Sequence, residues 1–172
     1  MVPTAFPDNL YAILQPAKEV GGDFYDFSEK NEYLYFAIGD VSGKGVPAAL
    51  VMTITLSAFH FMCGQELSIG EIMCQVNNMV SNGNKDFMFV TMFAGKLNLR
   101  SGELIYCNAG HNPIVYIEDN GNAKFLRAKS NIAIGLCENF PFQEELMILT
   151  AGSKLLLYTD GVTEAEKITK EQ

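Results

Sequence analysis

The segment Ile38-Gly39-Asp40-Val41-Ser42-Gly43-Lys44-Gly45-Val46-Pro47 decides how this chain folds. An apolar run, residues 33–38, leads into it, and an apolar-rich segment, residues 48–62, follows it. Glycine suits tight turns and proline suits the first turn of a helix. The pattern therefore predicts a buried strand that delivers Asp40 to the rim of the core and then turns into a helix. We interpret Asp40 as the central ligand of a divalent-metal site.

The composition indicates one globular domain. The chain has 172 residues, of which 48% are hydrophobic and 19% are charged, as in folded domains with a real core. A net charge of −8 argues against nucleic-acid binding, because phosphate contacts need Lys and Arg. The four cysteines form no CxxC pair and there are only two histidines, which disfavours a zinc site and favours free thiols in a reducing compartment.

Neither a membrane span nor a signal peptide is evident. No window reaches the roughly 18 uninterrupted apolar residues of a span, and the first residues lack a charged and then apolar leader. We expect no membrane insertion, and a location in the cytoplasm, either free or as the cytoplasmic domain of a membrane-bound sensor.

Hydrophobic periodicity predicts an α+β fold, with two packed, mainly antiparallel β-sheets (a β-sandwich) flanked by α-helices. Most successive strands are joined by short turns, which favours antiparallel pairing. Ser68, three residues before Glu71, predicts a capping box at the second helix. We expect about nine or ten strands in total. The predicted strands are residues 9–15, 20–27, 33–41, 87–97, 103–108, 114–117, 124–126, 145–149 and 154–158, and the predicted helices are 46–63 and 68–81.

Three aspartates share a setting, where an apolar strand meets a turn. Asp23 follows two glycines, Asp40 ends the run just described, and Asp160 follows residues 155–158 and precedes a glycine. Gathered carboxylates repel unless cations neutralise them, and ligand sets made only of oxygen select hard ions such as Mg²⁺ or Mn²⁺. Two such ions can clamp a phosphoryl group and activate a water. The alternative interpretation is turn formation, since Asp before Gly also makes Asx turns.

Other polar residues suggest weaker hypotheses. Lys44 between two glycines lacks the spacing of a nucleotide-binding P-loop. His111 stands in a loop, where it is either a proton donor or a hydrogen-bonded structural residue. Ser42 has no Asp-His partnership at hand and is interpreted as a turn hydroxyl rather than a nucleophile.

Four motifs in order carry a family resemblance: PAKEVGGDFYD at residues 16–26, GDVSGKGVPAA at 39–49, NAGHNP at 108–113 and YTDGVTEA at 158–165. With them the chain resembles the SpoIIE-like (RsbU-like) branch of the PPM family of metal-dependent Ser/Thr protein phosphatases. The resemblance runs from about residue 3 to residue 165 and implies a two-sheet β-sandwich flanked by helices.

The resemblance also implies residue roles. Asp40 would bridge two Mn²⁺ or Mg²⁺ ions, with the backbone carbonyl of Val41 as a further ligand. Asp160 would bind one ion and Asp23 the other, directly or through water, and a metal-activated water would attack a phosphoserine or phosphothreonine. Lys18 stands where related eukaryotic enzymes place a phosphate-clamping arginine, although lysine lacks the bidentate fork.

The partners implied by the resemblance belong to bacterial partner switching. The substrate would be a phosphorylated anti-sigma-factor antagonist. The two helices, the first of which begins with Val46, Pro47 and Ala48, resemble the element through which upstream sensor, receiver or coiled-coil segments act. We expect one exposed apolar edge, suited to a homodimer or a regulatory partner.

The family pattern extends past the last motif into a helix, an Asp-Asp stretch and a final strand. We therefore expect residues 1–172 to be a single PPM-type phosphatase domain excised from a longer multidomain signalling protein, with its C-terminal part missing and one of the two ions weakly held or lost. The alternative is a natural end, which would make the chain a catalytically silent phosphatase-like binding or regulatory module.

Overall fold

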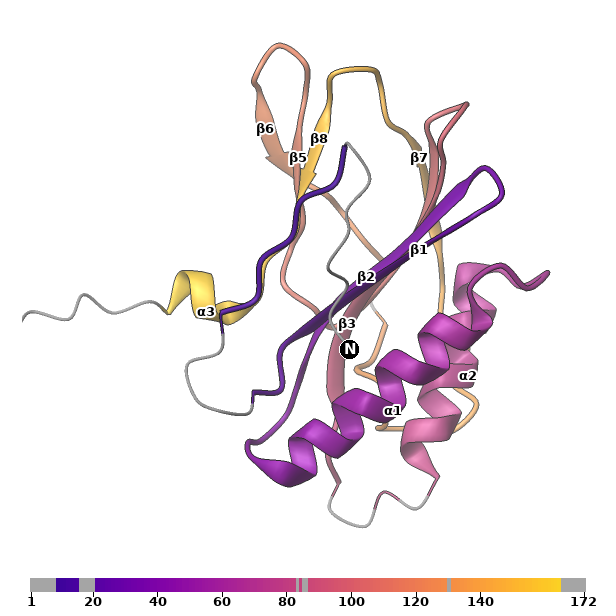
Figure 1. The fold of residues 1–172 in the computed structure, drawn as a ribbon, viewed down its shortest axis with the longest axis vertical. Coiled ribbons are helices and arrows are strands. Elements are labelled where there is room, and N and C mark those ends of the chain that lie inside the picture. The colour runs from indigo at the N-terminus through magenta and orange to yellow at the C-terminus, as the bar shows by residue number, and fades with distance from the viewer. Residues whose placement is uncertain (1–8, 16–20, 83, 85–86, 130, 165–172) are drawn as a thin grey trace, which may run out of the picture.

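The computed structural model describes residues 9–15, 21–82, 84, 87–129 and 131–164. Figure 1 shows two sheets and a pair of long helices packed together. In chain order the elements are β1 (Phe24–Lys30), β2 (Tyr33–Val41), α1 (Val46–Met62), α2 (Ile69–Ser81), β3 (Val90–Asn98), β4 (Glu103–Ala109), β5 (Val115–Ile117), β6 (Ala123–Phe125), β7 (Glu145–Ile148), β8 (Lys154–Leu156) and α3 (Asp160–Thr163).

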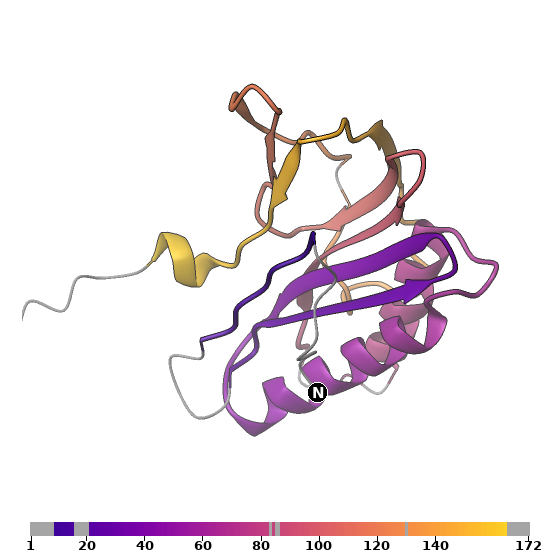
Figure 2. The ribbon, with the colours of Figure 1, turned by 45° about the horizontal axis from the view of Figure 1, so that its top comes forward.

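The larger sheet has five strands in the order β1-β2-β3-β4-β7, and every neighbouring pair is antiparallel. Helices α1 and α2 lie side by side and cover one face of this sheet (Figures 1 and 2). Apolar residues of α2 recur at helical spacing, so that one stripe of the helix is fully buried. The main core lies between the helices and the sheet; its largest fully buried side chains include Phe59, Ile69, Ile72, Met73 and Met92.

The smaller sheet has three strands in the order β6-β5-β8 and packs on the opposite face of the larger sheet. A second core fills the space between the sheets and is built around Phe93, Leu104, Tyr106 and Ile114. The rings of Phe93 and Tyr106 stack there with their centroids 5.6 Å apart. The predicted sandwich of mainly antiparallel sheets with flanking helices is therefore confirmed.

Several predicted boundaries are confirmed within two residues. The strand predicted at residues 33–41 has those bounds, and the helices predicted at 46–63 and 68–81 are α1 and α2. Ser68 caps α2 through a reciprocal capping box with Glu71, as the sequence predicted. Alternation and capping are local signals, so they can be interpreted without knowledge of the tertiary structure.

Other predicted strands are wrong or too long. Residues 9–15 belong to neither sheet, and the side chains of Tyr11 and Ile13 are largely exposed there. The strand predicted at 87–97 begins only at Val90, because Phe87 has a positive φ of 51° and the Asn84 side chain holds both the N–H and the C=O of Met88. The described residues therefore form eight strands rather than nine or ten.

The four cysteines are free, as predicted. Burial raises the pKa of the Cys63 and Cys107 thiols to about 12, so both behave as apolar core groups. Within the part of the chain that the structure describes, no helix has the length and apolarity needed to cross a membrane.

Candidate metal centre

Asp23 and Asp40 are brought together by the register of β1 and β2. Phe24 pairs with Gly39, so Asp23, one residue before β1, stands opposite Asp40 near the end of β2. The sequence placed Asp23 inside a strand at residues 20–27, which is wrong, because β1 begins only at Phe24. The start of one antiparallel strand meets the end of its partner, and this geometry makes the two carboxylates neighbours.

Alternation along β2 decides which face carries Asp40. Phe36 and Ile38 pack against the core between the sheets, whereas Tyr35 and Ala37 face the helices. Successive side chains of a strand point to opposite faces, so Asp40 lies on the face of Phe36 and Ile38. The candidate site is therefore at the end of the space between the two sheets, away from the helices.

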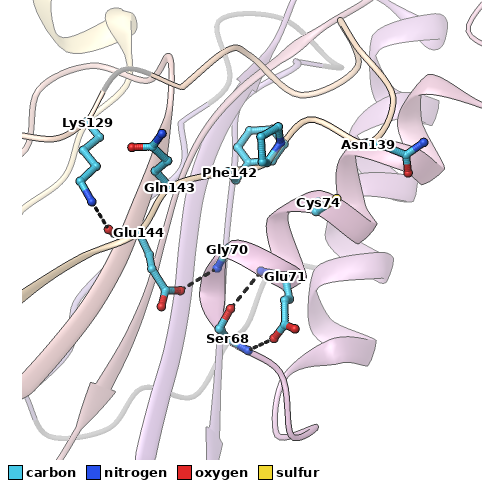
Figure 3. Close-up of a pocket in the computed structure, with 10 residues that line it drawn as sticks. Ser68, Gly70, Glu71, Cys74, Lys129, Asn139, Phe142, Gln143 and Glu144 are labelled. Atoms are coloured by element: carbon cyan, nitrogen blue, oxygen red, sulfur yellow. Dashed lines mark hydrogen bonds between the residues drawn. The ribbon is translucent and has the colours of Figure 1, made fainter.

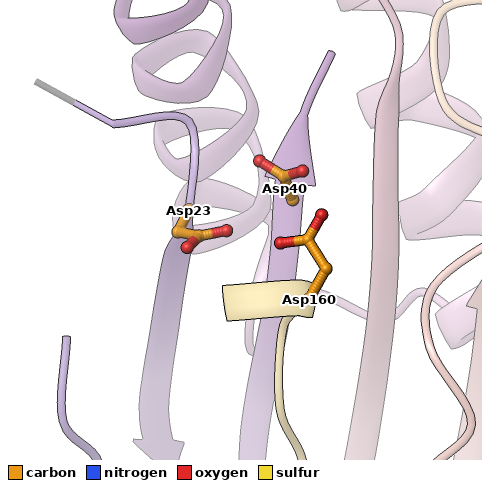
Figure 4. A group of neighbouring side chains, drawn as sticks. All are labelled: Asp23, Asp40 and Asp160. Carbon is orange, nitrogen blue, oxygen red and sulfur yellow. The ribbon is translucent and has the colours of Figure 1, made fainter. Parts of the chain in front are cut away.

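The third carboxylate comes from the smaller sheet. Asp160 is the first residue of α3, which follows β8, and Figure 4 shows the three aspartate side chains converging. One carboxylate oxygen from each of Asp23, Asp40 and Asp160 lies within 4.8 Å of the others. The Thr159 hydroxyl donates a hydrogen bond of 3.2 Å to Oδ2 of Asp23 and so ties the two sheets together at this point.

Gly22 leaves backbone and side-chain oxygens uncovered at the same place. A Cβ atom on Gly22 would stand 2.8 Å from the carbonyl oxygen of Val41 and 3.0 Å from Oδ1 of Asp40. Real Cβ atoms essentially never come within 3.0 Å of other heavy atoms. The absence of a side chain therefore lets the chain at Gly22 approach these oxygens closely, and one of them is the predicted carbonyl ligand, Val41.

The electrostatics of the cluster are unfavourable for the protein alone. Burial, followed by the charges of Asp23 and Asp160, raises the pKa of Asp40 from 3.8 to about 6, and the Val41 amide offsets only part of this. Burial also raises the pKa of Asp23, although the Thr159 hydrogen bond opposes it. None of the ion pairs formed by the described residues involves these three aspartates. Among the described residues, negative charge is thus concentrated here without a paired cation.

The donor set fits a hard divalent cation. All of its atoms are carboxylate or carbonyl oxygens, which suit Mg²⁺ and Mn²⁺, and the set contains no thiolate or imidazole that would favour a softer metal. A cation would remove the repulsion that raises the pKa of Asp40. Turn formation, the alternative interpretation, does not account for three carboxylates from three separate segments.

The turn after Asp40 connects the site to α1. The Ser42 hydroxyl accepts a hydrogen bond of 2.8 Å from the Phe89 amide, so it acts as a turn hydroxyl, as predicted. Gly43 and Gly45 both have positive φ, which lets the chain reverse before α1. Val46 and Pro47 are exposed at the start of the helix and Ala48 is buried. Lys18, the predicted phosphate contact, lies outside the described residues.

Sequence reasoning missed several partners of the site. No local pattern singles out Thr159 beyond its motif, or Thr91, which pairs with Asp40 across β2 and β3. His111 stands in a loop, as predicted, but the sequence did not show that it is buried there, and burial lowers its pKa to about 4. Only the pairing of distant strands places these residues around the aspartates. Their local sequence gave no signal of it.

Two hollows in the surface lie away from the three aspartates. A hollow of about 600 Å³ lies beside the start of α2, where the Gly70 amide donates a 2.9 Å hydrogen bond to the Glu144 carboxylate (Figure 3). Lys129 donates to the carbonyl of Glu144 at 3.2 Å. A second hollow, of about 290 Å³, is lined in part by His111. Neither hollow is lined by the three aspartates, so what marks the metal centre is the chemistry of its ligands.

Comparison with known sequences gives a family match. The family model described as stage II sporulation protein E (SpoIIE) matches residues 30–172. The phosphoserine phosphatase RsbU of Bacillus subtilis is 31% identical over 153 residues, which cover 89% of this chain and 46% of that protein. Protein IcfG of Synechocystis is 32% identical over 202 residues, covering 99% of this chain and 32% of that protein. The chain thus spans less than half the length of these relatives.

Comparison with solved structures agrees with this family match. The RsbU and RsbW domains of a Mycobacterium tuberculosis protein match with a TM-score of 0.75 and 29% identity, covering 87% of this chain and 42% of that one. The PP2C phosphatase domain of Bacillus subtilis SpoIIE, with a fragment of its regulatory domain, also has a TM-score of 0.75, at 21% identity, covering 90% of this chain and 44% of that one. The second likeness shows the shared PP2C-like fold.

Proposed function

The chain belongs to the SpoIIE family, and from this premise we propose that it acts as a metal-dependent phosphatase on phosphoserine or phosphothreonine of a signalling protein. The observation that carries the proposal is the meeting of Asp23, Asp40 and Asp160 within 4.8 Å, with no protein cation beside them among the described residues. The names of two relatives, the phosphoserine phosphatases RsbU and RsbP of Bacillus subtilis, support the choice of phosphoserine.

The residues of the centre have distinct parts in this proposal. Asp40, between the other two carboxylates in chain order and next to Val41 in the chain, would hold both Mn²⁺ or Mg²⁺ ions. Asp23 and Asp160 would each complete the shell of one ion. Bound there, the ions would lower the pKa of a water and withdraw charge from the phosphoryl oxygens. Thr159 would keep Asp23 oriented through its hydrogen bond.

A protein substrate suits the setting of the centre better than a small molecule. The aspartates lie at an edge, with Asp160 exposed and Asp23 and Asp40 half-buried, and neither of the two hollows described above is lined by them. An exposed centre can receive a phosphorylated side chain that projects from a folded partner. The family resemblance favours a phosphorylated anti-sigma-factor antagonist as that partner, and α1, joined directly to Asp40 and Val41 by the turn at residues 42–45, as the route of regulation.

The test is phosphate release from a phosphoserine-bearing anti-sigma-factor antagonist domain, measured with Mn²⁺, with Mg²⁺ and with chelator. We expect release that needs the metal and is lost in Asp40→Asn. The matched control is Asp119→Asn, the same change at an exposed turn aspartate outside the centre, which should behave as wild type. Absence of metal-dependent release, together with no Mn²⁺ bound at millimolar concentration, would favour a catalytically silent module instead.

A further inference from the structure

The crossover from the larger to the smaller sheet passes beside the three aspartates. β4 ends at Ala109 in one sheet and β5 begins at Val115 in the other, and His111 lies between them with only 7% of its surface exposed. The Asn108 side chain holds the main chain of His111 on both sides. Its Oδ1 accepts a 2.7 Å hydrogen bond from the His111 amide, and its Nδ2 donates a 3.1 Å bond to the His111 carbonyl. The backbone therefore fixes where the imidazole stands.

One side of the imidazole faces the larger sheet. Its Nδ1 lies 3.4 Å from the Thr91 hydroxyl, and Thr91 is the residue that pairs with Asp40 across β2 and β3. The same hydroxyl lies 3.5 Å from the carbonyl oxygen of Asp40, at the long limit of a hydrogen bond. The single hydroxyl proton of Thr91 can go to Nδ1 or to this carbonyl but not to both, so the link from His111 to Asp40 runs from the imidazole to Thr91 and then through the backbone pairing of Thr91 with Asp40.

The other influences on the ring come from the smaller sheet. Burial lowers the pKa of His111 to about 4, while the Tyr158 backbone carbonyl and then the Asp160 carboxylate act in the opposite direction. The ring is therefore neutral near pH 7, with one nitrogen as a donor and the other as an acceptor. Nε2 is buried and has no hydrogen-bond partner among the described residues. A buried polar atom left unpaired is costly, so we assign the proton to Nε2, from which it can be donated to an acceptor of the smaller sheet, and Nδ1 then accepts from the Thr91 hydroxyl.

The segment that carries Asp160 has few other supports. Its strand, β8, has only three residues and ends at Leu156, four residues before Asp160. In the described part of the chain, the Thr159 hydroxyl joins this segment to the larger sheet through its hydrogen bond to Asp23, just before β1. Asp23 and Asp40, in contrast, lie opposite each other just beyond the end of the seven-pair ladder between β1 and β2. The distance from Asp160 to Asp40 therefore depends on contacts between the sheets.

We propose that His111 is a positioning residue, which spans from Thr91 in the larger sheet to residues 158–160 of the smaller sheet and so sets where Asp160 stands relative to Asp40. Its effect on catalysis rests on the proposed function, because the spacing of these carboxylates decides how tightly a shared ion is held. Partners that orient metal ligands typically change metal affinity by about 10- to 100-fold when they are removed.

The experiment compares four variants with the wild-type chain. His111→Leu removes both ring nitrogens, whereas His111→Gln keeps a donor and an acceptor. Thr91→Val removes the hydroxyl beside Nδ1 at similar volume and serves if His111→Leu does not fold. The matched control is Tyr106→Phe, which removes another buried hydrogen bond of this region, from the Tyr106 hydroxyl to the Arg127 carbonyl, 2.8 Å long. Mn²⁺ affinity is measured by calorimetry, and hydrogen exchange of residues 157–164 is measured without metal.

We expect His111→Leu to weaken binding of one Mn²⁺ by about tenfold or more and to speed exchange of residues 157–164. His111→Gln should stay within about threefold of wild type in affinity, and Thr91→Val should fall between the two. Tyr106→Phe should lower the unfolding temperature while leaving both readouts unchanged. Unchanged exchange and affinity in His111→Leu, or in Thr91→Val if the former does not fold, would overturn the proposal. A wild-type chain that binds no Mn²⁺ would refute the proposed function. The exchange data would still show whether His111 holds the segment that carries Asp160 in place.

Discussion

The two sheets hold their parts of the candidate metal centre in different ways. In the larger sheet, β2 has nine residues and is hydrogen-bonded to β1 on one side and β3 on the other, so the place of Asp40 follows from strand register. In the smaller sheet, β8 has three residues and pairs only with β5 among the described strands. Asp160 lies beyond its end. Backbone pairing thus places two ligands, and side-chain contacts place the third.

The residues of the larger sheet are also more deeply buried than those of the smaller sheet. The face of the larger sheet under α1 and α2 is closed by the main core, whereas all three residues of β6 are exposed and Leu156 on β8 is 53% exposed. Regions with few buried contacts open at lower free energy than the core does. The comparison indicates a rigid half that carries Asp23 and Asp40 and a softer half that carries Asp160. The following predictions test that division, from the largest expected effect to the smallest.

Removing the charge of the central ligand should have the largest effect. In Asp40→Asn we expect phosphatase kcat/KM to fall by about a thousandfold or more, equivalent to about 4 kcal/mol, because both ions lose a shared ligand. Steady-state kinetics over a wide Mn²⁺ range would measure it. The circular dichroism spectrum should stay that of the wild type, and restoration of activity by excess Mn²⁺ would show that Asp40 is not shared.

Core truncation should separate the two halves by stability. Ile72 is fully buried under the larger sheet, so Ile72→Ala should lower the free energy of unfolding by about 3 kcal/mol. Leu156→Ala, on the smaller sheet and half-exposed, should cost about 0.5 kcal/mol or less. Urea denaturation of both variants provides the comparison. Equal losses would mean that the smaller sheet is as firmly packed as the larger one.

Loss of the ligand from the softer half should be milder than loss of Asp40. We expect Asp160→Asn to weaken binding of one ion by about 10- to 100-fold, with activity partly recovered at high Mn²⁺. Calorimetric titration and activity at several Mn²⁺ concentrations would show it. If Asp160→Asn were as inactive as Asp40→Asn at every Mn²⁺ concentration, the two aspartates would contribute equally to activity, and the expected difference between them would be wrong.

The smallest effect concerns pH in the metal-free protein. The pKa of Asp40 rises on folding from 3.8 to about 6, so the folded state binds the proton more tightly than the unfolded state does. Stability should therefore fall as the pH increases from about 4 to about 6, by about 1 kcal/mol once solvent screening of this half-buried group is allowed for. Thermal unfolding across this range in chelator measures it. The decline should be smaller in Asp40→Asn and should disappear when Mn²⁺ is added.

Much of the rigid half could be predicted from the sequence. The apolar run before Asp40 gave the bounds of β2, and Ser68 with Glu71 gave the start of α2, because periodicity and capping depend on residues close in the chain. Local patterns failed at residues 9–15 and at Phe87. Alternation cannot show that residues 9–15 join neither sheet, or that the Asn84 side chain bends the chain before Val90.

By itself, the sequence determined which residues could bind a cation: three aspartates, each beside a glycine or an apolar run. Only the tertiary structure decided that they meet. Antiparallel pairing brought the start of β1 to the end of β2, and packing of the second sheet brought Asp160 to the same edge. The burial of His111 between the sheets was decided in the same way. Register and distances between sheets arise from contacts far apart in the chain, and no short segment of sequence encodes them.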